Sequence, residues 1–175
     1  MKRLSLALIV SIAVFGLACG KKGDSAATNA LPKSALPDSY LLAGAPAGAT
    51  PVLAMRANAK AGDDVVVQGR AKDFVDGRAA FTMFDPSHPA CNEGSRMPDC
   101  ETPWDLCCDD PREVANLSTT VEFRDANGVL KTGVQGFHGL DHLDDVFVAG
   151  KLEKDGAGNL TVVAKNFYFA KHPKQ

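Results

Sequence analysis

The chain has 175 residues and a formal net charge of −2, with 19 Lys and Arg against 21 Asp and Glu. This length is enough for one domain with a hydrophobic core and short extensions. The slight acidity argues against a polyanionic partner, because nucleic-acid-binding domains carry a basic surface.

The chain begins with the pattern of an export signal. Lys2 and Arg3 precede an apolar run, Leu4 to Leu17, that only two serines and one glycine interrupt. The run is shorter than the about 20 apolar residues of a membrane-spanning helix, and small residues follow it as at a cleavage site. Residues 1–18 are therefore predicted to be a signal peptide. Without Lys2 and Arg3, 17 basic residues remain against 21 acidic ones.

The stretch GLAC at 16–19 resembles the lipobox of bacterial lipoproteins, in which a small residue precedes a cysteine that is acylated and becomes the mature N-terminus. The pattern departs from the family in one place, because Gly16 stands where leucine is usual and Leu17 follows it. The resemblance implies lipidation at Cys19 and attachment to a membrane through this lipid. Gly20 after the cysteine implies an outer-membrane lipoprotein that faces the periplasm. An ordinary secretory signal with an incidental cysteine is the alternative.

Residues 19–49 are rich in Ala, Gly, Ser and Pro and show no sustained apolar period. Such a segment cannot bury enough apolar surface to offset the entropy lost on ordering. It is predicted to be the lipidated N-terminus and a flexible tether. The remaining residues, 50–173, are expected to form one domain.

The domain is predicted to be all-β with short helices. Thr50 as an N-cap before Pro51 predicts a helix over 51–59. Apolar alternation and turn signals, among them Asn127-Gly128, predict β-strands. These strands are expected within 61–74, 78–85 and 118–125 and twice within 144–169, and the stretch 130–137 is expected to extend the sheet.

The layout of these strands resembles the OB-fold over about 64–169. There are five main strands, a short helical segment at 139–145 lies between the third and fourth, and V-x-V-x-G occurs in the first and fourth. Gly69 and Gly150 end these motifs and suit the bends of coiled barrel strands. The resemblance implies a small five-stranded Greek-key barrel. An open β-sandwich is the competing architecture.

Residues 86–118, here called the cysteine loop, form a long insertion between the second and third main strands. The loop has five prolines and few apolar side chains, and its four thiols are Cys91, Cys100, Cys107 and Cys108. An even number of cysteines in an exported protein predicts disulfides. A Cys107–Cys108 bond would distort the peptide between them, so Cys91 and Cys100 are each expected to pair with one member of this adjacent pair.

Two other interpretations of the cysteine loop stay open. The four cysteines, joined by His88, could bind a metal, although gaps of eight, six and no residues differ from the usual zinc spacing. Adjacent cysteines suit Cu(I) or a cluster better. A redox centre is the third interpretation. Asp105, Asp109 and Asp110 oppose it, because nearby negative charge raises the pKa of a thiol.

His138 and His142 form a second, weaker metal candidate, because they are four residues apart and acidic residues lie near them. Two surface histidines on an acidic turn are the simpler interpretation. The sequence contains no HExxH, G-x-S-x-G or phosphate-binding glycine motif. No catalytic residue and no cofactor is therefore assigned.

The outward face of the predicted sheet has one aromatic side chain and mixed charge, which argues against binding of single-stranded nucleic acid. This face is expected to carry Gln68, Arg70, Thr82, Phe84, Thr120, Glu122 and Arg124. The sequence thus predicts a non-enzymatic, lipid-anchored module of the cell envelope with a disulfide-stapled loop. Its contact surface for an envelope protein or a small ligand is expected to include Trp104, Phe84, Arg70 and Arg124.

Overall fold

The structure is a computed structural model that describes residues 30–91, 93, 100, 102 and 104–172. The predicted signal peptide and Cys19 lie outside the described residues. Within the described part of the chain, no helix has the length and apolar character needed to cross a membrane.

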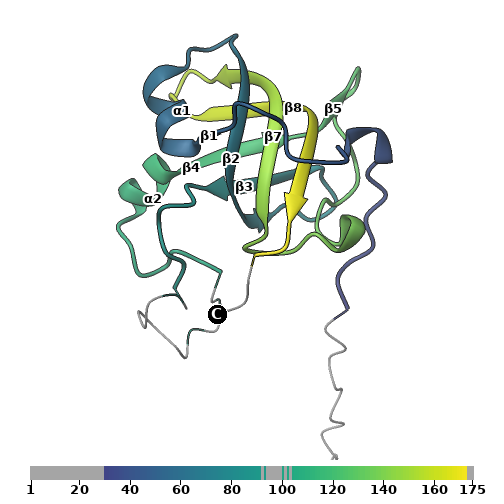
Figure 1. Ribbon diagram of the computed structural model, residues 1–175, viewed down its shortest axis with the longest axis horizontal. Helices are drawn as coiled ribbons and strands as arrows, with labels where there is room; N and C mark the ends of the chain where they lie inside the picture. The colour runs from purple at the N-terminus through teal and green to yellow at the C-terminus, as the bar shows by residue number, and fades with distance from the viewer. Residues whose placement is uncertain (1–29, 92, 94–99, 101, 103, 173–175) are drawn as a thin grey trace, which may run out of the picture.

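Five strands of the domain close into a ring (Figure 1). They are β2 (Asp64–Phe74), β3 (Ala80–Phe84), β4 (Ser118–Glu122), β7 (Asp145–Lys154) and β8 (Leu160–Ala170). Neighbouring strands are antiparallel except β4 and β8, which are parallel, and β7 returns to pair with β2. The two-residue β1 (Thr50–Pro51) runs parallel to β2 at one side. The prediction of a mainly β domain with short helices is confirmed.

Alternate side chains of the ring point into one hydrophobic core, as the period-two pattern predicts. Its largest fully buried members are Phe81, Met83, Phe123, Leu140, Leu152 and Phe167. The rings of Phe123 and Phe167 meet edge-on with centroids 5.1 Å apart. Val65, near the exposed start of β2, is partly buried and packs against this core.

The two glycines predicted at strand bends lie against the backbone of neighbouring strands. A Cβ on Gly69 would lie 2.6 Å from the carbonyl oxygen of Phe84, and a Cβ on Gly150 would approach that of Val163 more closely still. The register of β7 against β8 shifts between Ala149 and Gly150. Neither position has room for a side chain, because two strands approach each other closely there.

The predicted helix over 51–59 is present as α1 (Val52–Asn58). Thr50 does not cap it, because this residue lies in β1 and its hydroxyl donates to a carbonyl of β2. The carboxylate of Asp85, which follows β3, accepts a hydrogen bond of 2.8 Å from the Leu53 backbone N–H. The start of α1 is thus capped by a residue from a distant part of the sequence.

Residues 34–42, which composition assigns to the flexible tether, pack against the barrel. Leu36 is 4% exposed and belongs to the main core. The hydroxyl of Tyr40, in the short helix η1 (Asp38–Tyr40), donates to the Arg124 carbonyl. The backbone N–H of Leu42 donates to β8. The packed domain therefore begins before residue 50, because this segment has its own apolar and hydrogen-bonding contacts.

The connection from β4 to β7 contains the predicted Asn127-Gly128 turn, with Gly128 at φ 104°. This turn joins β5 (Arg124–Asp125) to β6 (Gly128–Val129). The expected strand over 130–137 is wrong, because this stretch forms a loop that leads into η2 (Phe137–Gly139). Leu140 follows η2 and is fully buried in the core, so the segment contributes packing rather than a strand.

Candidate metal centre

The cysteine loop leaves the barrel at the end of β3 and returns through a short helix to β4 (Figure 1). This helix, α2 (Pro111–Leu117), was not predicted. The Asp110 side chain accepts a hydrogen bond from the Arg112 backbone N–H, and Pro111 occupies the first turn. The Asp-Pro pair is a standard helix-start signal, so the sequence did contain the information for this helix.

A second, small hydrophobic cluster fixes the base of the cysteine loop. Phe84 at the end of β3 packs with Ala90 and Leu106 of the loop, and all three are at most 2% exposed. Val114 of α2 and Leu143 pack against them. The loop therefore has a core of its own, although the sequence showed too few apolar residues for one.

Two basic residues of β2 bind acidic residues on both arms of the cysteine loop. Arg70 Nη1 lies 2.5 Å from Glu93 Oε1, and the two side chains are 4% and 11% exposed. Lys72 Nζ lies 2.9 Å from Asp105 Oδ1. Glu93 lies two residues after Cys91, and Asp105 lies two residues before Cys107. These ion pairs tie the cysteine-bearing segments to the barrel.

The predicted contact surface is wrong for Arg70 and Phe84. These residues do point away from the barrel core, but the cysteine loop covers this side, and they are 3% and 0% exposed. The guanidinium carbon of Arg70 lies 4.8 Å from the centre of the Phe84 ring. Arg124 is partly exposed and forms ion pairs with Glu122 and Glu153 at 2.6 and 2.9 Å. Its charge is already paired with carboxylates of β4 and β7.

Trp104 contributes to the packing of the cysteine loop. Its ring stacks on that of His142 with centroids 4.4 Å apart and an interplanar angle of 19°. The ring of His142 also makes a T-shaped contact with Phe74 of β2, and its Nδ1 bonds to the Lys72 carbonyl oxygen. The half-buried indole therefore fixes one arm of the loop against the loop between η2 and β7.

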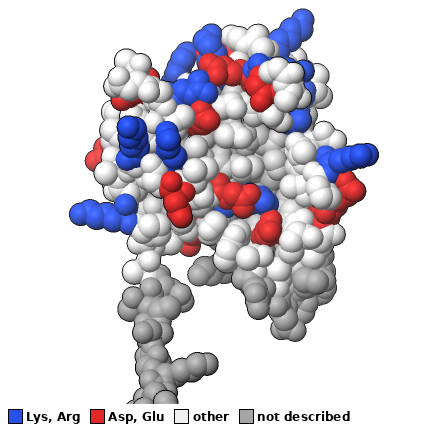
Figure 2. All heavy atoms as spheres, turned by 180° about the vertical axis from the view of Figure 1, so that it is seen from behind, with Lys and Arg blue, Asp and Glu red and all other residues white. Residues whose placement is uncertain are grey.

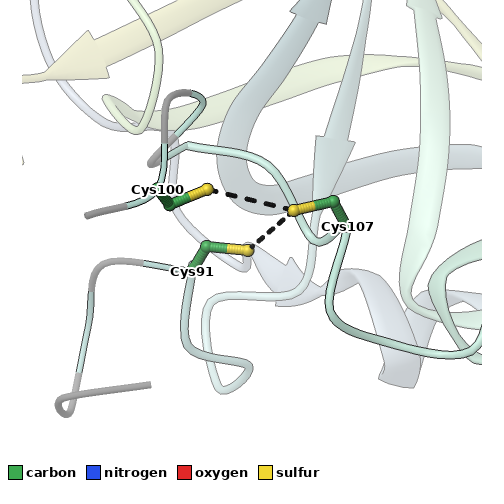
Figure 3. Close-up of side chains that lie close together, drawn as sticks. All are labelled: Cys91, Cys100 and Cys107. Carbon is green, nitrogen blue, oxygen red and sulfur yellow. Dashed lines mark hydrogen bonds between the residues drawn. The ribbon is translucent and has the colours of Figure 1, made fainter. Parts of the chain in front are cut away.

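The four cysteine sulfur atoms meet at one place. Cys91 Sγ lies 3.4 Å from Cys107 Sγ and 3.5 Å from Cys108 Sγ. Cys107 Sγ lies 3.9 Å from Cys100 Sγ and 4.0 Å from Cys108 Sγ. Figure 3 shows the side chains of Cys91 and Cys100 directed toward Cys107, each from a different part of the loop. Cysteines that are separated by eight and six residues in the sequence thus lie next to one another in space.

No disulfide joins the cysteines in the described part of the chain, so the predicted pairings of Cys91 and Cys100 with Cys107 and Cys108 are not formed in this structure. The sulfur separations exceed the about 2.0 Å of a disulfide. Ion pairs from β2 and the small core around Phe84 hold the loop instead.

The cysteines differ in exposure and in acidity. Cys91 is buried, Cys100 is intermediate, and Cys107 and Cys108 are exposed. Burial raises the pKa of Cys91, but hydrogen bonds from the Cys108 backbone and the other thiols outweigh burial, so its pKa is below the usual value. Hydrogen bonding to Cys91 raises the pKa of Cys107 to about 12 and also raises that of Cys108. Cys91 is thus the more acidic of these three thiols, and a second negative charge beside a first is unfavourable without a cation.

The histidine candidates do not join the cysteines. His88 Nε2 pairs with Asp109 at 3.0 Å, and His138 Nε2 pairs with Asp38 at 2.8 Å. His138 and His142 do not share a helical face, because η2 ends at Gly139. Among the described residues, the group of potential metal ligands whose sulfur atoms all lie within 4.8 Å of one another consists of Cys91, Cys100 and Cys107, and Cys108 lies beside this group.

Comparison with protein-family models found no match, and comparison with curated proteins found no similar sequence.

Proposed function

We propose that this protein is a non-enzymatic, lipid-anchored module of the bacterial cell envelope whose barrel presents a thiolate site for one soft metal ion. The four cysteines are the ligands, and Zn²⁺ and Cu(I) are the ions whose chemistry suits them.

The separations between the sulfur atoms carry this proposal. Four thiolates around a tetrahedral zinc ion at about 2.3 Å lie about 3.8 Å from one another. The four separations given above range from 3.4 to 4.0 Å and lie on both sides of this value. Cys91, Cys100 and Cys107 all lie within 4.8 Å of one another, which is close to the dimensions of a single coordination shell. Cys108 lies near Cys91 and Cys107 and is proposed to complete the shell by moving toward Cys100.

The barrel is proposed to be OB-like. The strand order β2-β3-β4-β8-β7, closed by β7 on β2 and with β4 and β8 parallel, supports this proposal. The insertion between β3 and β4 and the connection through η2 between the third and fourth main strands support it further.

Attachment through Cys19 and a location at the outer membrane rest on the export signal and the lipobox-like stretch. An envelope protein or a small ligand remains the proposed partner. Figure 2 shows both basic and acidic side chains on this face of the molecule, without a continuous basic stripe among its described residues. This pattern supports the expectation that nucleic acid is not the partner.

A disulfide-stapled loop is the second candidate. Cys91 lies 3.5 Å from Cys108 and Cys100 lies 3.9 Å from Cys107, so each pair would need to approach by about 1.5 to 2 Å to form a bond. This pairing is one of the two that the sequence favours. An oxidising compartment supports it.

Metal analysis combined with thiol counting separates the two candidates. A Cys19→Ser form of the exported protein, purified without chelator or reductant, is expected to contain one metal ion and four reduced thiols by native and denaturing mass spectrometry. A variant with serine at Cys91 and Cys107 is the control and is expected to lose the metal. Two disulfides and no metal in the purified protein, followed by no zinc binding once the disulfides have been reduced, would refute the metal site.

A further inference from the structure

The four sulfur atoms form a site with a closed side and an open side. Cys91 is fully buried, and its backbone N–H donates to the Asp105 carbonyl at 3.1 Å. Cys107 and Cys108 are exposed at the other side, in the turn that precedes α2. A metal ion held here would be anchored from inside and reachable from solvent through two adjacent ligands.

The core clusters and the ion pairs that hold the loop do not involve the sulfur atoms. The main core lies inside the barrel, and the cluster of Phe84, Ala90 and Leu106 lies at the base of the loop. Arg70 and Lys72 hold the two arms of the loop through ion pairs with Glu93 and Asp105, without contribution from the sulfur atoms. Structural zinc sites differ, because they are closed and supply much of the folding free energy themselves.

We propose that this site exchanges its metal ion directly with a thiol-bearing donor or acceptor, through attack on the metal at the exposed side formed by Cys107 and Cys108. This inference rests on the proposed metal-binding function and names its partner class. The incoming group is a cysteine pair of a second protein or a low-molecular-weight thiol.

The exchange step is a ligand substitution and needs no oxidant or reductant. The incoming sulfur forms a bond to the metal, and the bond from the metal to Cys107 or Cys108 breaks. The proton of the incoming thiol passes to the departing cysteine sulfur, so the number of protons and the oxidation state of the metal stay unchanged. Cys91 is the last protein ligand to leave, because it is the one that solvent does not reach.

The test measures release of Zn²⁺ from the lipidated full-length protein in detergent micelles. The acceptors are a small monothiol, a peptide with two cysteines, and a carboxylate chelator without sulfur. The release rate is expected to increase in proportion to the concentration of each thiol acceptor and to be independent of the carboxylate chelator. Faster transfer to the peptide than to the monothiol at equal thiol concentration assigns the exchange to a protein partner, and the reverse order assigns it to a small thiol.

Two matched variants locate the side of attack. Cys108→Ser is expected to raise the thiol-dependent rate several-fold with zinc still bound, because it opens the exposed side. Cys91→Ser removes the buried anchor and is expected to weaken zinc binding most. Circular dichroism of the zinc-free protein is expected to show an intact β domain with a cooperative thermal transition.

Release that is independent of thiol concentration, from a protein that binds one zinc ion, would overturn the exchange while leaving the metal site in place. Unfolding of the domain on zinc removal would overturn it in the same way. A protein that binds no zinc under reducing conditions would overturn the proposed function itself.

Discussion

Arg70 on β2 and Glu93 in the cysteine loop form an ion pair that is almost fully removed from solvent, with side chains 4% and 11% exposed. Glu93 also accepts a hydrogen bond from the Ala90 backbone N–H at 2.8 Å. Burial raises the pKa of Glu93, but the hydrogen bond and charge of Arg70 outweigh burial, so its pKa is below the usual range. The pair fixes the loop to the barrel because each charge has the other as a buried partner.

Glu93→Gln leaves the Arg70 guanidinium buried without a carboxylate. Removal of one partner of a buried pair costs about 3 to 5 kcal/mol of unfolding free energy. Urea denaturation of the zinc-free protein measures this loss. The control is Glu153→Gln, because Glu153 also pairs with an arginine, Arg124, but its own side chain is 51% exposed. Its cost is expected to be about 0 to 1 kcal/mol. Equal effects of the two variants would contradict the assigned role of Glu93.

Lys72→Met is expected to weaken zinc binding without changing the ratio of one ion per protein. Lys72 bonds to Asp105, two residues before Cys107, so its loss releases the segment that carries the exposed ligands. Loss of an interaction that orients metal ligands costs about 10- to 100-fold in affinity. Competition with a coloured zinc chelator measures this change. Lys165→Met, which removes an exposed pair with Asp64, is expected to leave the affinity unchanged.

Asp85→Asn tests the cap of α1 through pH. Burial raises the pKa of Asp85, but hydrogen bonds from the Ser87 hydroxyl and the backbone N–H groups of Leu53 and Ser87 outweigh it, so the folded-state pKa is below the usual value. The unfolded-state pKa is about 3.9. The stabilisation by the carboxylate is therefore complete at neutral pH and is lost as the pH falls through the folded-state pKa.

The measurement for Asp85 is the difference in unfolding free energy between the native protein and Asp85→Asn at several pH values. It is expected to be large at neutral pH and to decrease below pH about 4. Asp76→Asn, at an exposed turn position, serves as the control. A difference that does not vary between neutral and acidic pH would show that the charge of Asp85 does not stabilise the fold.

Gly150→Ala is expected to destabilise the barrel, because the added methyl group would meet the backbone carbonyl of Val163 in the next strand. Overpacking of this kind costs about 1 to 3 kcal/mol. Thermal unfolding measures the loss. Gly156→Ala, in the turn between β7 and β8 with no atom within 4 Å of its Cβ position, is the matched control. A loss of stability in Gly150→Ala no larger than that in Gly156→Ala would show that β7 can pack against β8 without a glycine at position 150.

Cys19→Ser tests the proposed lipid anchor. The native protein is expected to incorporate radiolabelled palmitate in growing bacteria and to sediment with membranes, because Cys19 supplies the acylated thiol. The variant is expected to lose the label and to appear in the soluble fraction. Cys100→Ser keeps the anchor and is the control. Label that persists in the Cys19→Ser variant would place the modification elsewhere.

Local patterns in the sequence determined the barrel strands, the Asn127-Gly128 hairpin turn and the glycines at positions 69 and 150. These features depend on side-chain alternation and backbone freedom within a few residues, so a short window of sequence contains their cause. The same alternation placed Arg70 and Phe84 on the side of the strands away from the core. This assignment of the face was correct.

Only the tertiary structure decided what lies on that face. The cysteine loop packs over Arg70 and Phe84 and buries them, and its Glu93 pairs with Arg70, 23 positions earlier in the sequence. Each of its four cysteine sulfur atoms lies within 4.0 Å of at least one other. The packing of α1 beside the end of β3 likewise places the Asp85 carboxylate at the start of this helix, 32 positions away from Leu53 in the sequence. These contacts depend on how distant segments pack in three dimensions, and no local propensity carries that information.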